Sequence, residues 1–146
     1  MAVLRDQPYA NARFVVEIDG METQAFAEVH LPEMSDDVVE YRDGTDKDAA
    51  PRKLPGRPRY GTMTLRRGFR GGLELHQWWR EATNGGQGGR RNVLVRLLDE
   101  GATSVVAEWR LRAAWPARHW FSPLVAQGCE TLMENVELAC DSVELS

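Results

Sequence analysis

Short segments in which apolar and polar side chains alternate are the feature of this chain that most constrains its fold. In residues 13–19, Phe14, Val16 and Ile18 fall on one face of an extended strand. Such alternation is typical of β-strands with one buried face. Many short strands separated by glycine-containing turns predict a mainly β chain, folded as a β-sandwich or barrel. Six further segments show the pattern and are expected to form strands: 24–31, 37–42, 60–69, 91–98, 104–112 and 130–145.

One segment has the helical period instead. Asn84 and Gly85 supply a stop signal after it, so the sequence predicts a helix over residues 73–83. We expect its two tryptophans to pack against the sheets, because both lie on the apolar face; the alternative is a surface that stacks a ligand. Four side chains lie at i, i+3, i+4 and i+7, on one helical face: Leu75, Trp78, Trp79 and Ala82.

Residues 43–60 show neither period and contain three prolines and two glycines. The segment is too charged for the core of a small domain. We therefore expect an extended loop on the surface. A loop of this length inside a chain of 146 residues, which is most simply one domain over 1–146, usually has a function.

The charges around this loop are segregated, although the formal net charge of the chain is only −4. Residues 33–48 hold seven acidic and two basic residues, and residues 52–69 hold six basic residues. One hypothesis is a nucleic-acid-binding β-barrel that uses the basic loop 52–70, although basic domains are the usual phosphate binders. The other is contact between identical copies, in which the acidic patch of one copy meets the basic patch of the next.

No arrangement of residues indicates catalysis. His30, His76 and His119 have no partner at metal-ligand spacing, and no P-loop or nucleophile-elbow sequence is present. Cys129 and Cys140 are expected to be reduced. The longest apolar run is residues 1–4, too short for a membrane span or a signal peptide. We expect a protein made in the cytoplasm, with no enzymatic activity, cofactor or metal.

Several sequence landmarks occur in an order typical of one family. They are YANARFVVEIDG, AFAEVHLPEMSDDVVEYRDG, RKLPGRPRYGTMTLRRGF, LELHQWWRE, the hairpin RRNVLVRLLDEGATSVVAEWRLRAAWPAR, and ETLMENVELACDSVEL. With these landmarks the chain resembles the tail tube proteins of contractile phages and of phage-tail-like contractile injection systems.

The resemblance implies two packed antiparallel sheets, one flanking helix and a long extended loop. It further implies six copies per ring, and rings stacked into a hollow tube inside a contractile sheath. Expected partners are other copies of the chain, the sheath, baseplate and cap or terminator proteins, and cargo in the lumen. The resemblance places the long loop and the hairpin loops at contacts between rings. The candidate residues for the subunit and ring interface are Asp43, Asp46, Asp48, Arg52, Lys53, Arg57, Arg59 and Tyr60.

The lining of such a channel is expected to be polar, because a conduit should not hold what passes through it. Alternation along three strands selects the polar faces, although it does not give the order of the strands. The channel-lining candidates are Thr62, Thr64, Arg66, Glu108, Arg110, Asn135 and Glu137.

Overall fold

The computed structural model describes residues 5–10, 13–23, 25–42, 44, 50–85 and 87–146. The elements are β1 Phe14–Ile18, β2 Glu28–His30, β3 Met34–Tyr41, β4 Arg52–Tyr60, β5 Met63–Gly68, α1 Glu74–Thr83, the 3-10 turn Gln87–Gly89, β6 Arg91–Leu98, β7 Val105–Phe121, β8 Met133–Ala139 and β9 Ser142–Leu145. The chain is therefore mainly β with one α-helix among the described residues, as the sequence predicts.

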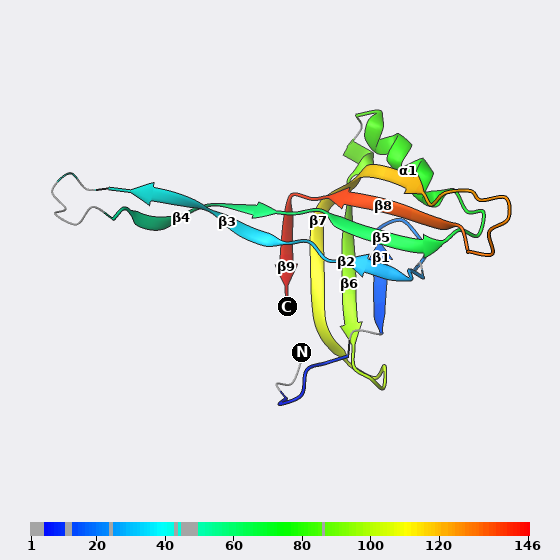
Figure 1. Cartoon of the computed structure of the whole chain (residues 1–146), viewed down its shortest axis with the longest axis horizontal. Coiled ribbons are helices and arrows are strands. Elements are labelled where there is room, and N and C mark those ends of the chain that lie inside the picture. The colour runs from blue at the N-terminus through cyan, green and yellow to red at the C-terminus, as the bar shows by residue number, and fades with distance from the viewer. Residues whose placement is uncertain (1–4, 11–12, 24, 43, 45–49, 86) are drawn as a thin grey trace.

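Two antiparallel layers share the long strand β7. Hydrogen-bonded neighbours follow the order β1-β6-β7-β8-β5-β2, and β9 also pairs with β7. The first half of β7 pairs with β6 and β9, whereas its second half pairs with β8. We call β1, β6, β9 and the first half of β7 the first layer. The second layer is β2, β5, β8 and the second half of β7, and its strands cross those of the first layer (Figure 1).

The change of layer in β7 has a local cause. Ala113 adopts a positive φ of 53°, which turns the strand and interrupts its regular ladder. On β6 the register shifts between Arg91 and Val93. The residue between them, Asn92, compensates through its side chain: its Oδ1 accepts a hydrogen bond from the N–H of Ala113 at 3.1 Å.

The core lies between the two layers and contains the residues that alternation selects. The first layer contributes Val16, Ile18, Val93, Val95 and Leu111, and the second contributes Met63, Leu65, Val136 and Leu138. All are at most 3 % exposed. The alternation in these strands therefore identified the buried face correctly.

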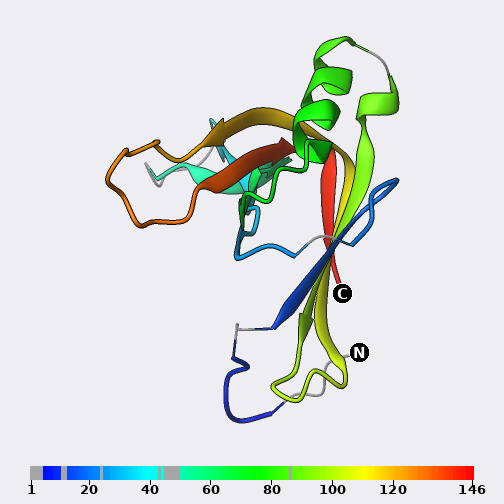
Figure 2. The same cartoon turned by 90° about the vertical axis from the view of Figure 1, so that its right-hand side faces the viewer.

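Helix α1 closes one end of this core (Figure 2). Leu75 and Trp78 are fully buried, as the helical period predicts, whereas Trp79 is only half-buried. Trp78 Nε1 donates a hydrogen bond to the carbonyl oxygen of Gly89 at 2.6 Å. A β-carbon at Gly89 would lie 2.5 Å from the Cα of Ala82, so only glycine allows the returning chain this close to the helix.

Strand boundaries differ most from the predictions in three places. The predicted strand 24–31 contains only the short β2. The predicted strand 104–112 continues to Phe121, and the predicted strand 130–145 is broken at Cys140 and Asp141 into β8 and β9. The predicted loop 43–60 contains a strand, described below.

A buried ionic cluster beneath the helix links three strands of the second layer to one another. The sequence pattern did not reveal this cluster. Glu134, 1 % exposed, lies on the core side of β8. Its Oε1 accepts a hydrogen bond from Arg67 Nε at 2.7 Å, and its Oε2 lies 2.8 Å from His119 Nε2. Each carboxylate oxygen thus has a partner, which is what burial of a charge requires.

Replacement of Trp78 by Ala is expected to destabilise the fold by about 3 to 5 kcal/mol, because it leaves a cavity and orphans the carbonyl of Gly89. Trp79→Ala is the matched control and should cost only about 1 to 2 kcal/mol, since that indole is partly solvated. Denaturant unfolding of both variants measures the difference. Equal losses would show that the helix does not dock through Trp78.

Candidate subunit interface

Strands β3 and β4 form a two-stranded ribbon that projects far from the two packed layers (Figure 1). We call this ribbon the arm. The prediction of an extended loop over 43–60 is therefore wrong for residues 52–60, which form β4. The prediction of a long segment outside the core is correct, because seven of the eight residues of β3 and seven of the nine residues of β4 are exposed.

The prolines that argued against a strand fit this ribbon for a physical reason. Pro55 pairs with Val38 and Pro58 with Asp36, and the register shifts between these two pairs. A two-stranded ribbon has an open side on each strand, so a residue without an N–H can face solvent. Gly56 sits at the shift, where a β-carbon would lie 2.9 Å from the carbonyl oxygen of Asp37.

The acidic and basic segments meet inside one chain. Arg59 Nε donates a hydrogen bond to Asp37 Oδ1 at 2.6 Å, and Lys53 lies opposite Glu40 in the ladder. The hydrogen bond from Arg59 lowers the pKa of Asp37. The arm therefore neutralises part of its own charge, which the sequence did not predict.

The other interface candidates are distributed along the same arm. Arg52 lies opposite Tyr41, and Arg57 is exposed beside the register shift. Tyr60 is half-buried at the base of the arm and packs against the core. Three candidates lie outside the described residues: Asp43, Asp46 and Asp48.

One face of the arm carries an apolar stripe. Val39 pairs with Leu54, and Tyr41 follows on the same face; these side chains are 49 %, 48 % and 52 % exposed. Val38 is exposed on the opposite face. A two-stranded ribbon cannot bury its own apolar side chains and is marginally stable alone. The stripe is therefore the part of the arm best suited to lie against another surface.

Five of the seven channel-lining candidates come together on the outer face of the second layer. In the ladders, Thr64 lies opposite Glu137 and Arg66 opposite Asn135. Thr62 Oγ1 donates a hydrogen bond to Glu137 Oε1 at 2.9 Å. This polar face continues on β2, where Glu28 and His30 lie opposite Arg66 and Thr64.

The other two candidates, Glu108 and Arg110, lie on the outer face of the first layer. There Arg96 bonds Glu17 at 2.6 Å and Glu108 at 3.4 Å, and Arg110 bonds Glu108 at 3.2 Å. Both layers turn their inner faces to the shared core, so their outer faces point in different directions. The seven candidates therefore cannot all line one channel.

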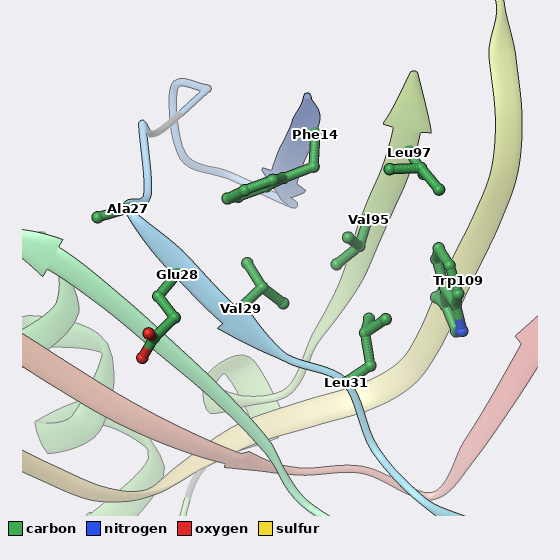
Figure 3. A pocket seen from close by; sticks show the side chains of 8 residues that line it. All are labelled: Phe14, Ala27, Glu28, Val29, Leu31, Val95, Leu97 and Trp109. Carbon is green, nitrogen blue, oxygen red and sulfur yellow. The ribbon is translucent and has the colours of Figure 1, made fainter. Parts of the chain in front are cut away.

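An apolar pocket of about 400 Å³ opens where the second layer meets the first (Figure 3). The pocket is lined by Phe14, Ala27, Glu28, Val29, Leu31, Val95, Leu97 and Trp109.

Among the described residues, no group of three or more His, Cys, Asp or Glu is placed to hold a metal ion. In the same part of the chain, no helix has the length and apolar character needed to cross a membrane.

Replacement of Arg59 by Gln is expected to raise the pKa of Asp37 toward the ordinary value of about 3.9, because the charged donor is lost. Arg57→Gln, which changes the same charge nearby on the arm, should leave that pKa almost unchanged. NMR titration of the Asp37 carboxyl in the three proteins checks this. An Asp37 pKa insensitive to Arg59→Gln would mean that the two side chains are not paired in solution.

Comparison with solved structures supports the fold over nearly the whole chain. The anti-feeding prophage baseplate, a 6-fold symmetrised structure, contains a chain with a TM-score of 0.81 and 21% identity, with 97% of each chain covered. A chain of the sheath–tube complex of the extracellular contractile injection system PVC, in its extended state, gives a TM-score of 0.79 and 26% identity, covering 97% of this chain and 93% of that one.

A third match is a chain of the tube-terminating cap of the anti-feeding prophage, with a TM-score of 0.80, 25% identity and coverage of 100% and 95%. No curated protein sequence matches the chain. The family model described as "T4-like virus tail tube protein gp19" matches residues 10–144, which is most of the sequence. The chain therefore belongs to the tail tube protein family of T4-like viruses, and is a structural tube protein of the kind found in phage tails and contractile injection systems.

Proposed function

We propose that this tube protein assembles as six-membered rings that stack into a hollow conduit for cargo. The observation that carries the proposal is the arm: a long ribbon with an exposed apolar stripe that nothing else in the described chain covers. The 6-fold symmetry of the anti-feeding prophage baseplate, which holds a similar chain, supports the ring size. A repeated head-to-tail contact that closes on itself produces such a ring.

The arm would lie against neighbouring subunits through its apolar stripe. Arg57 and Lys53 form no ion pair within the described part of the chain, so they are the cations best placed to meet acidic groups of a neighbour. Arg59 contributes less, because Asp37 already pairs with it. A single exposed pair adds only about 0 to 1 kcal/mol, but a tube repeats the contact at every subunit.

The outer face of the second layer would line the channel. It carries Thr62, Thr64, Arg66, Asn135 and Glu137, and Thr62 already donates a hydrogen bond to Glu137 on this face. The first described residues, 5–10, and the last strand, β9, both lie at the first layer (Figure 1). Both would therefore lie away from the channel.

In this arrangement Glu108 and Arg110 would face away from the channel. The outside of the tube would meet the sheath, and the ends of the tube would meet baseplate and cap or terminator proteins, as in the particles that hold the similar chains. Assembly would take place in the cytoplasm. The role is structural and uses no catalytic group.

Electron microscopy of arm variants tests the assembly. The double variant Lys53→Glu, Arg57→Glu should leave the barrel folded, because both side chains are exposed, but should shorten or abolish tubes. Arg70→Glu, an exposed charge reversal at the other end of the basic segment 52–70, is the matched control and should form normal tubes. Normal tubes from the double variant would show that Lys53 and Arg57 do not contribute to the contact between subunits.

The same proteins test the alternative of a nucleic-acid-binding barrel. Nucleic-acid binding would be lost equally when the charge is reversed at either end of the basic segment. The reason is that each contact between a basic side chain and a phosphate adds to the affinity whether or not tubes assemble. A wild-type protein that stays monomeric and shifts DNA in a gel would overturn the proposed function.

Cysteine labelling tests the lining. Thr64→Cys in assembled tubes should react with a small maleimide but not with a bulky polymer maleimide that cannot enter the bore. Arg110→Cys, on the outer face of the other layer, should react with both reagents. The reverse pattern would assign the channel to the first layer.

A further inference from the structure

The outer face of the second layer is ordered in rows that run across its four strands (Figure 1). Residues that lie opposite one another in an antiparallel ladder share a face, so the registers of the three ladders can be joined end to end. Both rows described here lie on the face that the proposed function places in the channel. The first row is Glu28, Arg66, Asn135 and Trp120, and the row beside it is His30, Thr64, Glu137 and Arg118.

Each row carries one acidic and one basic side chain. In the first row they are Glu28 and Arg66, and in the second they are Glu137 and Arg118. With His30 counted as neutral, both rows are electrically neutral, although the chain as a whole has a formal net charge of −4. The contact with His30, 2.8 Å between Nε2 and Oε2, lowers the pKa of Glu28, so this carboxylate stays ionised at neutral pH.

The opposite charges of a row lie on neighbouring strands, and this spacing decides how far their field reaches. Adjacent strands are about 4.8 Å apart. The potentials of two opposite charges this close cancel one another a few such spacings away, and salt screens the remainder over about 8 to 10 Å. A charged molecule that moves along the channel would therefore be neither held nor excluded because of its net charge.

Close to the wall, the charges remain available to other groups. Within the described residues, neither Arg66 nor Arg118 forms a direct ion pair. Arg118 instead stacks on Trp120, with its Cζ 4.2 Å from the ring centroid. The outer face of the first layer differs, because Arg96 there pairs with two carboxylates, at 2.6 and 3.4 Å. The second layer thus presents cations that no carboxylate of the same subunit binds, beside carboxylates that are ionised.

We propose that this face is a charge-balanced channel wall, which passes polypeptides of either net charge without sorting them. The proposal rests on the proposed function, because that function places the face in the channel, and it adds the class of cargo. A polypeptide carries charges of both signs, and each can meet an opposite charge in the same row. A nucleic acid carries only negative charge, about one per 1.7 Å along a duplex, and would meet a carboxylate in every row.

Stacked copies repeat the same rows, so a single substitution changes the charge of the whole wall. Arg66 and Glu137 lie on the two middle strands of the layer, β5 and β8, where a change leaves the edges of the layer intact. Arg66→Gln leaves one uncompensated negative charge per subunit, and Glu137→Gln leaves one positive charge. Glutamine at 137 also keeps an acceptor for the hydrogen bond from Thr62.

Charged thiol reagents measure the balance beside these side chains. Thr64→Cys is placed in a background of Cys129→Ser and Cys140→Ser, and assembled tubes react with a cationic and an anionic thiosulfonate of equal size. With rates divided by those for free cysteine, the two reagents should react at similar rates. Arg66→Gln should favour the cationic reagent by about tenfold at low salt, and Glu137→Gln should favour the anionic reagent to the same extent.

Glu108→Gln and Arg110→Gln are the matched controls, because they remove the same charges from the outer face of the first layer. Both should leave the ratio of rates unchanged. Wild-type tubes in which one reagent reacts about tenfold faster would overturn the inference, as would variants of Arg66 and Glu137 with the wild-type ratio. Either result leaves the assembly of tubes standing, whereas a protein that forms no tubes under the microscope would overturn the proposed function as well.

Enclosure during assembly tests the class of cargo. Tubes are assembled with a fluorescent peptide that carries glutamates, a peptide that carries lysines, or a single-stranded oligonucleotide of similar length, and a wash at high salt removes material bound outside. The two peptides should be enclosed in similar amounts, and the oligonucleotide in a smaller amount. An oligonucleotide enclosed as well as the peptides would overturn the assignment of polypeptide cargo. A strong preference for one peptide would overturn the charge balance.

Discussion

Every contact in the core depends on one strand being shared by two layers. Strand β7 pairs with β6 as far as Ala114 and with β8 from Trp115 onward, so the turn at the adjacent Ala113 sets how the inner faces meet. A positive φ at a residue with a β-carbon costs about 1 to 3 kcal/mol, and the hydrogen bond from Ala113 to Asn92 offsets part of that cost. Without the turn, β7 would extend a single flat sheet, and Val93 and Leu65 would have no opposite layer to pack against.

The parts of the fold that follow alternation could be predicted from the sequence. Val16, Val93 and Leu65 are buried because each occupies every second position of a strand with one inner face. The second half of β7 was missed for the opposite reason. Its inner face carries Pro116 and His119. His119 contacts a buried carboxylate, but the alternation pattern counts a histidine as polar and therefore does not identify this face as buried. The sequence pattern of β8 hides Glu134 in the same way, because a charge at an inner position contradicts simple alternation.

The arm shows a different limit of sequence reasoning. Prolines at 51, 55 and 58 argue against a strand in a sheet, but an isolated ribbon has solvent on both sides and tolerates them. Segregated charge predicted that opposite patches of neighbouring copies meet, and that contact stays a prediction. Within one arm, Asp37 and Arg59 already form an ion pair. Alternation also selected the polar faces without deciding which layer carries them. Glu108 and Thr64 have equivalent patterns, and only the strand order separates their surfaces.

Internal neutralisation of the arm has a consequence for the conditions that control polymerisation. Salt screens interactions between exposed charges over about 8 to 10 Å, so a contact based on opposite charges of two subunits would weaken as ionic strength rises. An arm that pairs Arg59 with its own Asp37 has less charge to lose to screening. Its stripe of Val39, Leu54 and Tyr41 would associate through apolar burial, which weakens on cooling and strengthens in sulfate or phosphate. The proposed polymerisation of the tube would then respond to temperature more than to the salinity of its surroundings.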